Sequence, residues 1–106
     1  MLSEARLRNA DLEKANLTKA SLNQADLTNA NLAEGNLAEA NLRWAILSGT
    51  KLPGVDLSHA DLARADLSRA ELSDANLQWA DLQWADLSEA NLQNSELNGA
   101  NLEWAN

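Results

Sequence analysis

The chain has 106 residues, with no Cys and a single His, and its 16 acidic and 8 basic residues give a net charge of −8. The lack of Cys excludes disulfides, thiol catalysis and cysteine-bound zinc, and we expect neither a metal site nor a cofactor. The acidic balance argues against nucleic acids and anionic membranes as partners.

Leucine recurs with a period of five residues along the whole chain. All 21 Leu occupy this phase, from Leu2 to Leu102, and none lies elsewhere. The position three residues after each Leu is small, and Ala fills 17 of its 21 occurrences. The exceptions there are Gly35, Thr50, Val55 and Ser95. Because Asp or Asn usually precedes Leu, the repeating unit is A-(D/N)-L-x-x.

A period of five fits neither regular secondary structure. On an α-helix, successive Leu would step by about 140° and cover every face. In a flat strand, an odd period sends alternate Leu to opposite faces. The chain must therefore turn a corner in each repeat, with Leu and the small residue inward and the other three residues facing water. The Asp or Asn before Leu is expected to accept a backbone N–H and set the turn.

Tandem A-(D/N)-L-x-x units covering the whole chain resemble the pentapeptide-repeat family. The resemblance implies an all-β fold, a right-handed quadrilateral β-helix (solenoid) of about five coils of four pentapeptide repeats. Residues 1–106 would form a single domain, a rod about 25 Å long at ~4.8 Å per coil. Four-sided stacking would place residues twenty apart in one column along the axis.

The consensus decays between residues 45 and 57, although the Leu phase is kept, so we expect no projecting loop. Pro53-Gly54 predicts a tight turn, because Pro fixes φ and Gly allows a positive φ. Gly35 and Val55 would share an inward column, where their volumes compensate. We therefore expect Gly35→Ala to clash with Val55.

All four Trp are the second residue after a Leu, a phase that should face outward. Stacking predicts that a guanidinium lies between two indoles, which is a favourable cation–π arrangement. The predicted columns read Trp44, Arg64, Trp84 and Trp104 on one face, and His59 and Trp79 on the next. Two interpretations remain open: a ladder that stiffens one face, or an exposed aromatic contact surface.

Charge is unevenly distributed along the chain. Residues 1–69 hold all 8 basic residues and 9 acidic ones, whereas residues 70–106 hold 7 acidic residues and no basic one. An acidic face could simply keep the protein in solution. The sharper hypothesis is a protein-contact surface for a basic partner, formed by Trp79, Trp84, Trp104, Asp81, Asp86 and Glu89.

No residue pattern indicates catalysis, because His59 has no partner residues around it and a filled solenoid has no cleft to shift carboxylate pKa values. We expect a non-enzymatic structural or interaction module, like the many small family members in cyanobacteria. The alternative is a DNA-mimicking inhibitor of a bacterial type II topoisomerase (DNA gyrase). Those relatives dimerise through a C-terminal helix that this sequence lacks.

The expected partner is a protein, with neither nucleic acid nor membrane as a target. Unpaired strand edges at the end coils would also favour end-to-end self-association. No apolar run approaches the ~18 residues of a membrane span and no signal peptide opens the chain, so a cytoplasmic location is expected.

Overall fold

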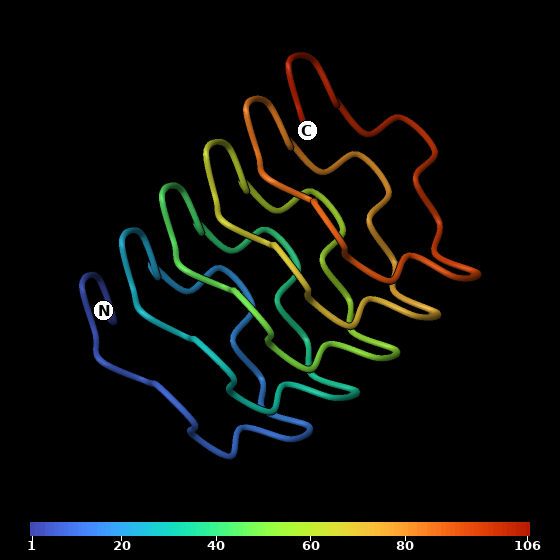
Figure 1. The fold of residues 1–106 in the computed structure, drawn as a ribbon. Helices are drawn as coiled ribbons and strands as arrows, with labels where there is room; N and C mark the ends of the chain where they lie inside the picture. Colours follow the sequence, from blue (N-terminus) through green and yellow to red (C-terminus); the bar gives the residue numbers. More distant parts are fainter.

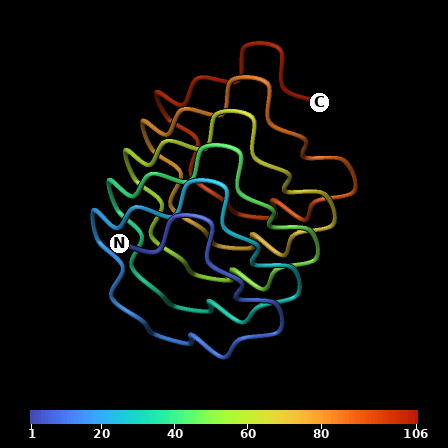
Figure 2. The ribbon, with the colours of Figure 1, turned by 90° about the vertical axis from the view of Figure 1, so that its left-hand side faces the viewer.

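Single-residue parallel bridges, with no helix and no longer strand, make up the regular structure of the computed structural model, which describes all residues 1–106. Each bridge joins a residue to the one twenty positions later, from Arg6 with Asp26 to Asp81 with Asn101. The chain rises as stacked coils from the N-terminus to the C-terminus (Figures 1 and 2). Four five-residue repeats therefore complete each coil of a β-helix. With no helix present, none is available to cross a membrane.

Backbone hydrogen bonds run in both directions between successive coils. The N–H of each Leu in the lower coil donates to a carbonyl nineteen residues later, as from Leu2 to Ser21 at 2.8 Å. The residue before Leu donates back toward the preceding coil, as from Asp26 to the Ala5 carbonyl at 2.9 Å. This two-way ladder fixes the twenty-residue register.

A four-residue turn forms in every repeat. The N–H three residues after Leu donates to the Leu carbonyl, as from Ala5 to Leu2 at 3.1 Å. The third residue of each turn has φ between 54° and 74°, and 18 of these 21 residues are not glycine. Positive φ at this position, but not at the one before, is the pattern of a type II turn. Pro53 and Gly54 occupy the middle of one such turn without an insertion, which confirms the prediction made for them.

The Asp and Asn side chains before Leu cap these turns. Asp or Asn precedes Leu in 14 repeats. In each of them, the side-chain Oδ1 accepts the backbone N–H of the residue two positions later. Ser58 donates to Asp56 at 2.9 Å and Ala38 to Asn36 at 3.0 Å. That N–H takes no part in the backbone ladder, so the side chain supplies the partner it lacks. The expected turn-setting role is confirmed.

The core is a column of leucine and alanine inside the coils. Every Leu from Leu22 to Leu82 is buried, whereas those nearer the ends are partly exposed, and Leu102 is 42% exposed. The Cα atoms span 28 × 24 × 22 Å, so the molecule is nearly as wide as it is long. The longest extent is close to the length of about 25 Å expected from the sequence, but the stack is nearly as wide as it is long and is not a slender rod.

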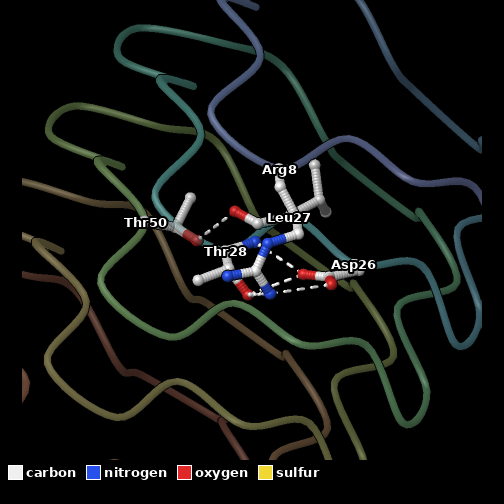
Figure 3. A network of polar contacts seen from close by, with 5 residues as sticks. All are labelled: Arg8, Asp26, Leu27, Thr28 and Thr50. Atoms are coloured by element: carbon white, nitrogen blue, oxygen red, sulfur yellow. Dashed lines mark hydrogen bonds and ion pairs between the residues drawn. The ribbon is translucent and has the colours of Figure 1, made fainter.

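The departures from alanine at the inward small position are accommodated individually. Thr50 is buried, and its hydroxyl donates to the Leu27 carbonyl one coil earlier at 2.9 Å (Figure 3). A Cβ at Gly35 would lie nearest to the Leu32 carbonyl oxygen at 3.0 Å and the Ala15 carbonyl oxygen at 3.4 Å. Val55 is not among the three nearest atoms, so the expected clash between Gly35→Ala and Val55 is wrong. The column is shared, but backbone oxygens set the space at Gly35.

A polar cluster beside this region links two coils. Asp26 accepts the Thr28 hydroxyl at 2.6 Å and the Arg8 guanidinium at 3.1 Å (Figure 3). The Thr28 hydroxyl, followed by the Thr28 backbone N–H and Arg8, holds the pKa of Asp26 below its usual value. Arg8 and Asp26 are 18 residues apart, which shows that ion pairs between coils also form off the straight column.

Candidate protein-contact surface

Three tryptophans and one arginine form a stack along a single column. The Trp84 and Trp104 rings are 5.3 Å apart between centroids and 13° from parallel. The Arg64 guanidinium lies 4.8 Å from the Trp44 ring and 5.5 Å from the Trp84 ring, and so is sandwiched between them. The stacking order predicted from the twenty-residue register is confirmed.

Trp79 lies in the neighbouring column, at the turn before Trp84. Its ring stacks on His59 with centroids 6.4 Å apart and planes 11° from parallel. Its indole also lies close to Gly99, where the missing Cβ leaves room for it. Trp79 therefore flanks the repeat that carries Trp84 but does not join the Trp84–Trp104 stack.

Every tryptophan remains exposed despite these contacts. The exposed fractions are 52% for Trp44, 60% for Trp79, 52% for Trp84 and 67% for Trp104. Each occupies the left-handed third position of its turn, which directs the side chain away from the core. Stacking hides parts of the ring faces while the ring edges meet water, so these indoles form an apolar surface.

Asp81 and Asp86 lie on either side of Trp84 in sequence and begin successive turns. The backbone N–H of Gln83 donates to Asp81 at 3.0 Å, and that of Ser88 to Asp86 at 2.9 Å. Hydrogen bonds from Ser88 hold the pKa of Asp86 below its usual range. Both carboxylates therefore have a structural role as turn caps, and both lie within three residues of Trp84 in sequence.

Glu103 is a further acidic residue of this surface that the sequence did not single out. Its two carboxylate oxygens accept the Trp104 indole Nε1–H at 3.0 Å and the Gln83 side-chain amide at 3.1 Å. The second bond spans twenty residues. Its signal in the sequence was only that Glu103 lies above Gln83 in one column.

Glu89 does not belong with these residues. It lies on the following turn and forms an ion pair with Arg69 at 3.1 Å, so a basic side chain already balances its charge. The other acidic residues of 70–106 have no basic side chain within ion-pair distance. We call Trp84, Trp104, Asp81, Asp86 and Glu103 the Trp–acid surface.

The side chains of this surface are indoles, amides and carboxylates. No group of three or more His, Asp or Glu side chains is placed to hold a metal ion. The largest hollow, about 520 Å³ and lined by Gln24, Trp44 and Ile46, is open to solvent. Indole edges, amides and carboxylates are what the surface presents to another molecule.

The family model described as pentapeptide repeats matches this chain in eight copies, over residues 2–33, 25–62, 36–74, 52–88 and 85–106. Among solved structures, a pentapeptide repeat protein from the Arabidopsis thaliana thylakoid lumen is similar, with 31% identity and a TM-score of 0.71. That match covers 91% of this chain and 63% of the other. The search among curated proteins found no match.

Two cyanobacterial pentapeptide repeat proteins are also similar. Rfr23 from Cyanothece 51142 shares 34% identity over 82% of this chain and 60% of its own, with a TM-score of 0.56. The protein alr5209 from Nostoc PCC 7120 shares 31% identity over 91% of this chain and 83% of its own, with a TM-score of 0.52. This chain thus spans about three fifths of the length of the first two similar structures.

Proposed function

Because this chain belongs to the pentapeptide-repeat family, we propose that it works as a non-enzymatic interaction module. In this role a rigid, right-handed quadrilateral β-helix holds the Trp–acid surface in place for a basic protein partner. Function lies in the surface and not in the fold, since one fold supports many functions.

One observation carries the proposal: two stacked, exposed indoles occur together with carboxylates that have no cationic partner. Trp84 and Trp104 are at least half exposed, and the Trp104 indole donates to Glu103. Asp81 and Asp86 lie within three residues of Trp84 in sequence, and none of the three carboxylates has a basic side chain within ion-pair distance. Tryptophan is enriched where interfaces gain most of their binding energy. Unbalanced negative charge steers and selects positively charged partners.

The second candidate, a DNA-mimicking topoisomerase inhibitor, is not favoured by any feature of the surface. All eight basic residues lie within residues 1–69, and seven of the nine acidic residues there either form an ion pair with one of them or lie two residues from an arginine.

 Five of these, Glu13, Asp26, Glu34, Glu39 and Asp61, form ion pairs, and Glu4 and Asp66 each lie two residues from an arginine. Mimicry of a duplex needs charge that continues along the molecule, as it does along DNA. We therefore expect no inhibition in a gyrase supercoiling assay.

The test is a binding titration with labelled unstructured peptides of equal length and basic, neutral or acidic composition, at about 0.1 M salt. We expect the basic class alone to bind, and binding to be lost in the double variant Trp84→Gln/Trp104→Gln. Gln24 occupies the same column with φ 60°, so glutamine fits this turn. Unchanged peptide binding by that variant would refute the proposal.

A charge variant separates the carboxylates from the fold. Asp81→Asn/Asp86→Asn keeps the turn caps, because Asn76 and Asn101 make the same bond at this phase. We expect weaker binding of basic peptides and an unchanged circular dichroism spectrum. The matched control is Asp11→Asn/Asp56→Asn, which removes equal charge from two other faces and should bind as the wild type does.

A second copy of the chain is the other occupant to be tested, because the exposed indoles of Trp84 and Trp104 can also pack against another copy. Sedimentation velocity over increasing concentration tests this occupant. If the wild-type chain associates with itself and the double variant Trp84→Gln/Trp104→Gln does not, then the partner of this surface is a second copy of the chain and not a basic protein.

A further inference from the structure

The arginine of the aromatic column is held between two indoles but pairs with no anion. We propose that Arg64 is a carboxylate site: the exposed edge of its guanidinium donates to an acidic side chain of the protein partner, while Trp44 and Trp84 hold the group in place. The inference rests on the proposed function and deepens it. The partner would carry an acidic residue next to the basic segment that meets the Trp–acid surface.

Arg64 lies inside the column, with one tryptophan in the coil before it and another in the coil after it. Its guanidinium carbon is 4.8 Å from the centroid of the Trp44 ring and 5.5 Å from that of Trp84. The residue as a whole is nevertheless exposed. A planar group that lies between two rings meets solvent or a ligand through its N–H edge, so this edge is the part of Arg64 that another molecule can reach.

The N–H groups of Arg64 have no acceptor within the chain. Arg8, Arg43 and Arg69 each donate to a carboxylate of another coil, at 3.1 to 3.4 Å. Arg64 forms neither such a hydrogen bond nor an ion pair. It is therefore a cation whose position is fixed by aromatic contacts and whose charge is not balanced.

The carboxylates nearest to Arg64 in sequence have other partners. Asp61 caps its own turn at 3.1 Å and forms an ion pair with Arg43 at 3.3 Å. Asp66 caps the following turn at 3.0 Å. Because both are bound to their own turns, the guanidinium edge is left for an acceptor that comes from outside.

A carboxylate suits this site better than a doubly charged phosphate does. A guanidinium donates two parallel hydrogen bonds that match the two oxygens of a carboxylate. One guanidinium balances one negative charge, and the net charge of −8 on the chain disfavours a second. Since the two indoles already restrict the arginine side chain, less conformational entropy is lost when the pair forms.

The main experiment compares peptides that share one basic segment and carry either glutamate or glutamine beside it, at several spacings from the segment. Affinity is measured by calorimetry at about 0.1 M salt. We expect the glutamate peptide of the best spacing to bind about two- to fivefold more tightly than its glutamine counterpart, as for an exposed charge pair. The sign is decisive, because long-range repulsion from an acidic protein would favour glutamine.

Two variants locate the site, and each has a matched control. Arg64→Gln should reduce the preference for glutamate to about one, and Gln24 shows that glutamine fits this column at φ 60°. Lys51→Gln, which removes another cation that forms no ion pair, should keep the preference. Trp44→Gln should lower the preference because Arg64 is then held on one side only, whereas Trp79→Gln in the neighbouring column should not.

NMR of the Arg64 Nε–H resonance distinguishes an acidic side chain of the partner from a small free carboxylate. The glutamate peptide should shift this resonance and the glutamine peptide should not. The N-methylamide of N-acetylglutamate, as a free carboxylate, should shift it only at much higher concentrations. A shift by this compound at the same concentrations as the peptide would overturn the assignment to a protein partner.

The outcomes separate this inference from the proposed function. Equal binding of glutamate and glutamine peptides at every spacing, lost in Trp84→Gln/Trp104→Gln, would overturn the carboxylate site and leave the interaction module standing. A preference for glutamate that survives Arg64→Gln, or that is unchanged in Trp44→Gln, would also overturn the site. If no peptide binds, the proposed function fails, and an Arg64 resonance that the free carboxylate does not shift would then overturn the site as well.

Discussion

Trp79 lies directly against the backbone of Gly99, the residue one coil above it. A Cβ built on Gly99 would come within 2.6 Å of Cδ2 of the indole, closer than real side chains approach. Gly99 also has φ 74°, in the left-handed region that favours glycine. Both the nearby indole and the left-handed backbone conformation therefore favour glycine at position 99.

Gly99→Ala should move the Trp79 indole and reduce stability by more than the backbone alone explains. Gly54→Ala is the control, because Gly54 has φ 64° but a Cβ there would meet only Glu34 Cγ, at 3.8 Å. The control should cost about 1–2 kcal/mol from left-handed backbone strain. Urea unfolding and Trp fluorescence measure the two effects. Equal costs with unchanged fluorescence would mean that Trp79 does not rest on Gly99.

The leucine core should be most sensitive at its middle. Leu62→Ala or Leu67→Ala should lower the free energy of unfolding by about 2–5 kcal/mol, because each truncation leaves a cavity among buried neighbours. Leu2→Ala should cost much less, since Leu2 is only partly buried. Chemical denaturation of the three variants measures this gradient, and a similar loss at all three positions would contradict it.

Gly35→Ala should be tolerated, with a gain in stability of at most about 0.4–1 kcal/mol, because the new Cβ would lie 3.0 Å from the Leu32 carbonyl oxygen. Alanine occupies the same phase in 17 repeats, and Gly35 does not have a positive φ, so the substitution mainly reduces the entropy of the unfolded chain. In a double-mutant cycle with Val55→Ala the two effects should add. A loss of stability that Val55→Ala relieves would restore the direct clash that the sequence suggested.

Asp26 should make the protein less stable in acid. Its pKa is lowered in the folded chain, first by the Thr28 hydroxyl and also by Arg8, so its stabilising effect is complete above the unfolded pKa, about 3.9. That contribution is lost as the pH falls through the folded pKa. In Asp26→Asn, the turn cap is kept and the titration removed, so unfolding curves from about pH 5 to pH 2 should show a weaker loss of stability than in the wild type. A constant difference between the two proteins over this range would show that Asp26 contributes no pH dependence.

Much of the architecture followed from periodicity, because the two inward residues of every five constrain every coil alike. The Leu phase, the caps of Asp56 and Asn36, and the Trp84–Trp104 stack could all be predicted from residue spacing. The Leu phase and the caps depend on the position within one repeat, and the stack depends on which residues share a column. They are insensitive to the detailed shape of any one turn.

The features that sequence reasoning missed depend on side-chain direction. The ion pairs Arg8–Asp26 and Arg43–Asp61 join residues 18 apart, whereas straight columns suggest only partners 20 apart. A long arginine side chain reaches sideways to a residue outside its own column, so residue spacing alone does not predict these ion pairs. The positive φ of Trp84 and Trp104 was equally hidden, since Trp has no special preference for the left-handed region. Glu103 was missed because its contacts require knowing where the Trp104 indole edge points.

The pairing of each residue with the one twenty positions later also constrains how the length of this chain can change. Inserting a single residue would turn every later leucine out of the core. Inserting five would keep the core intact but rotate all later residues onto the next face, so that Trp79 and not Trp84 would follow Arg64 in its column. Only insertions of twenty would preserve both the core and the columns. Whole-coil duplication is therefore the one kind of growth that lengthens this molecule without rearranging the surface that it presents.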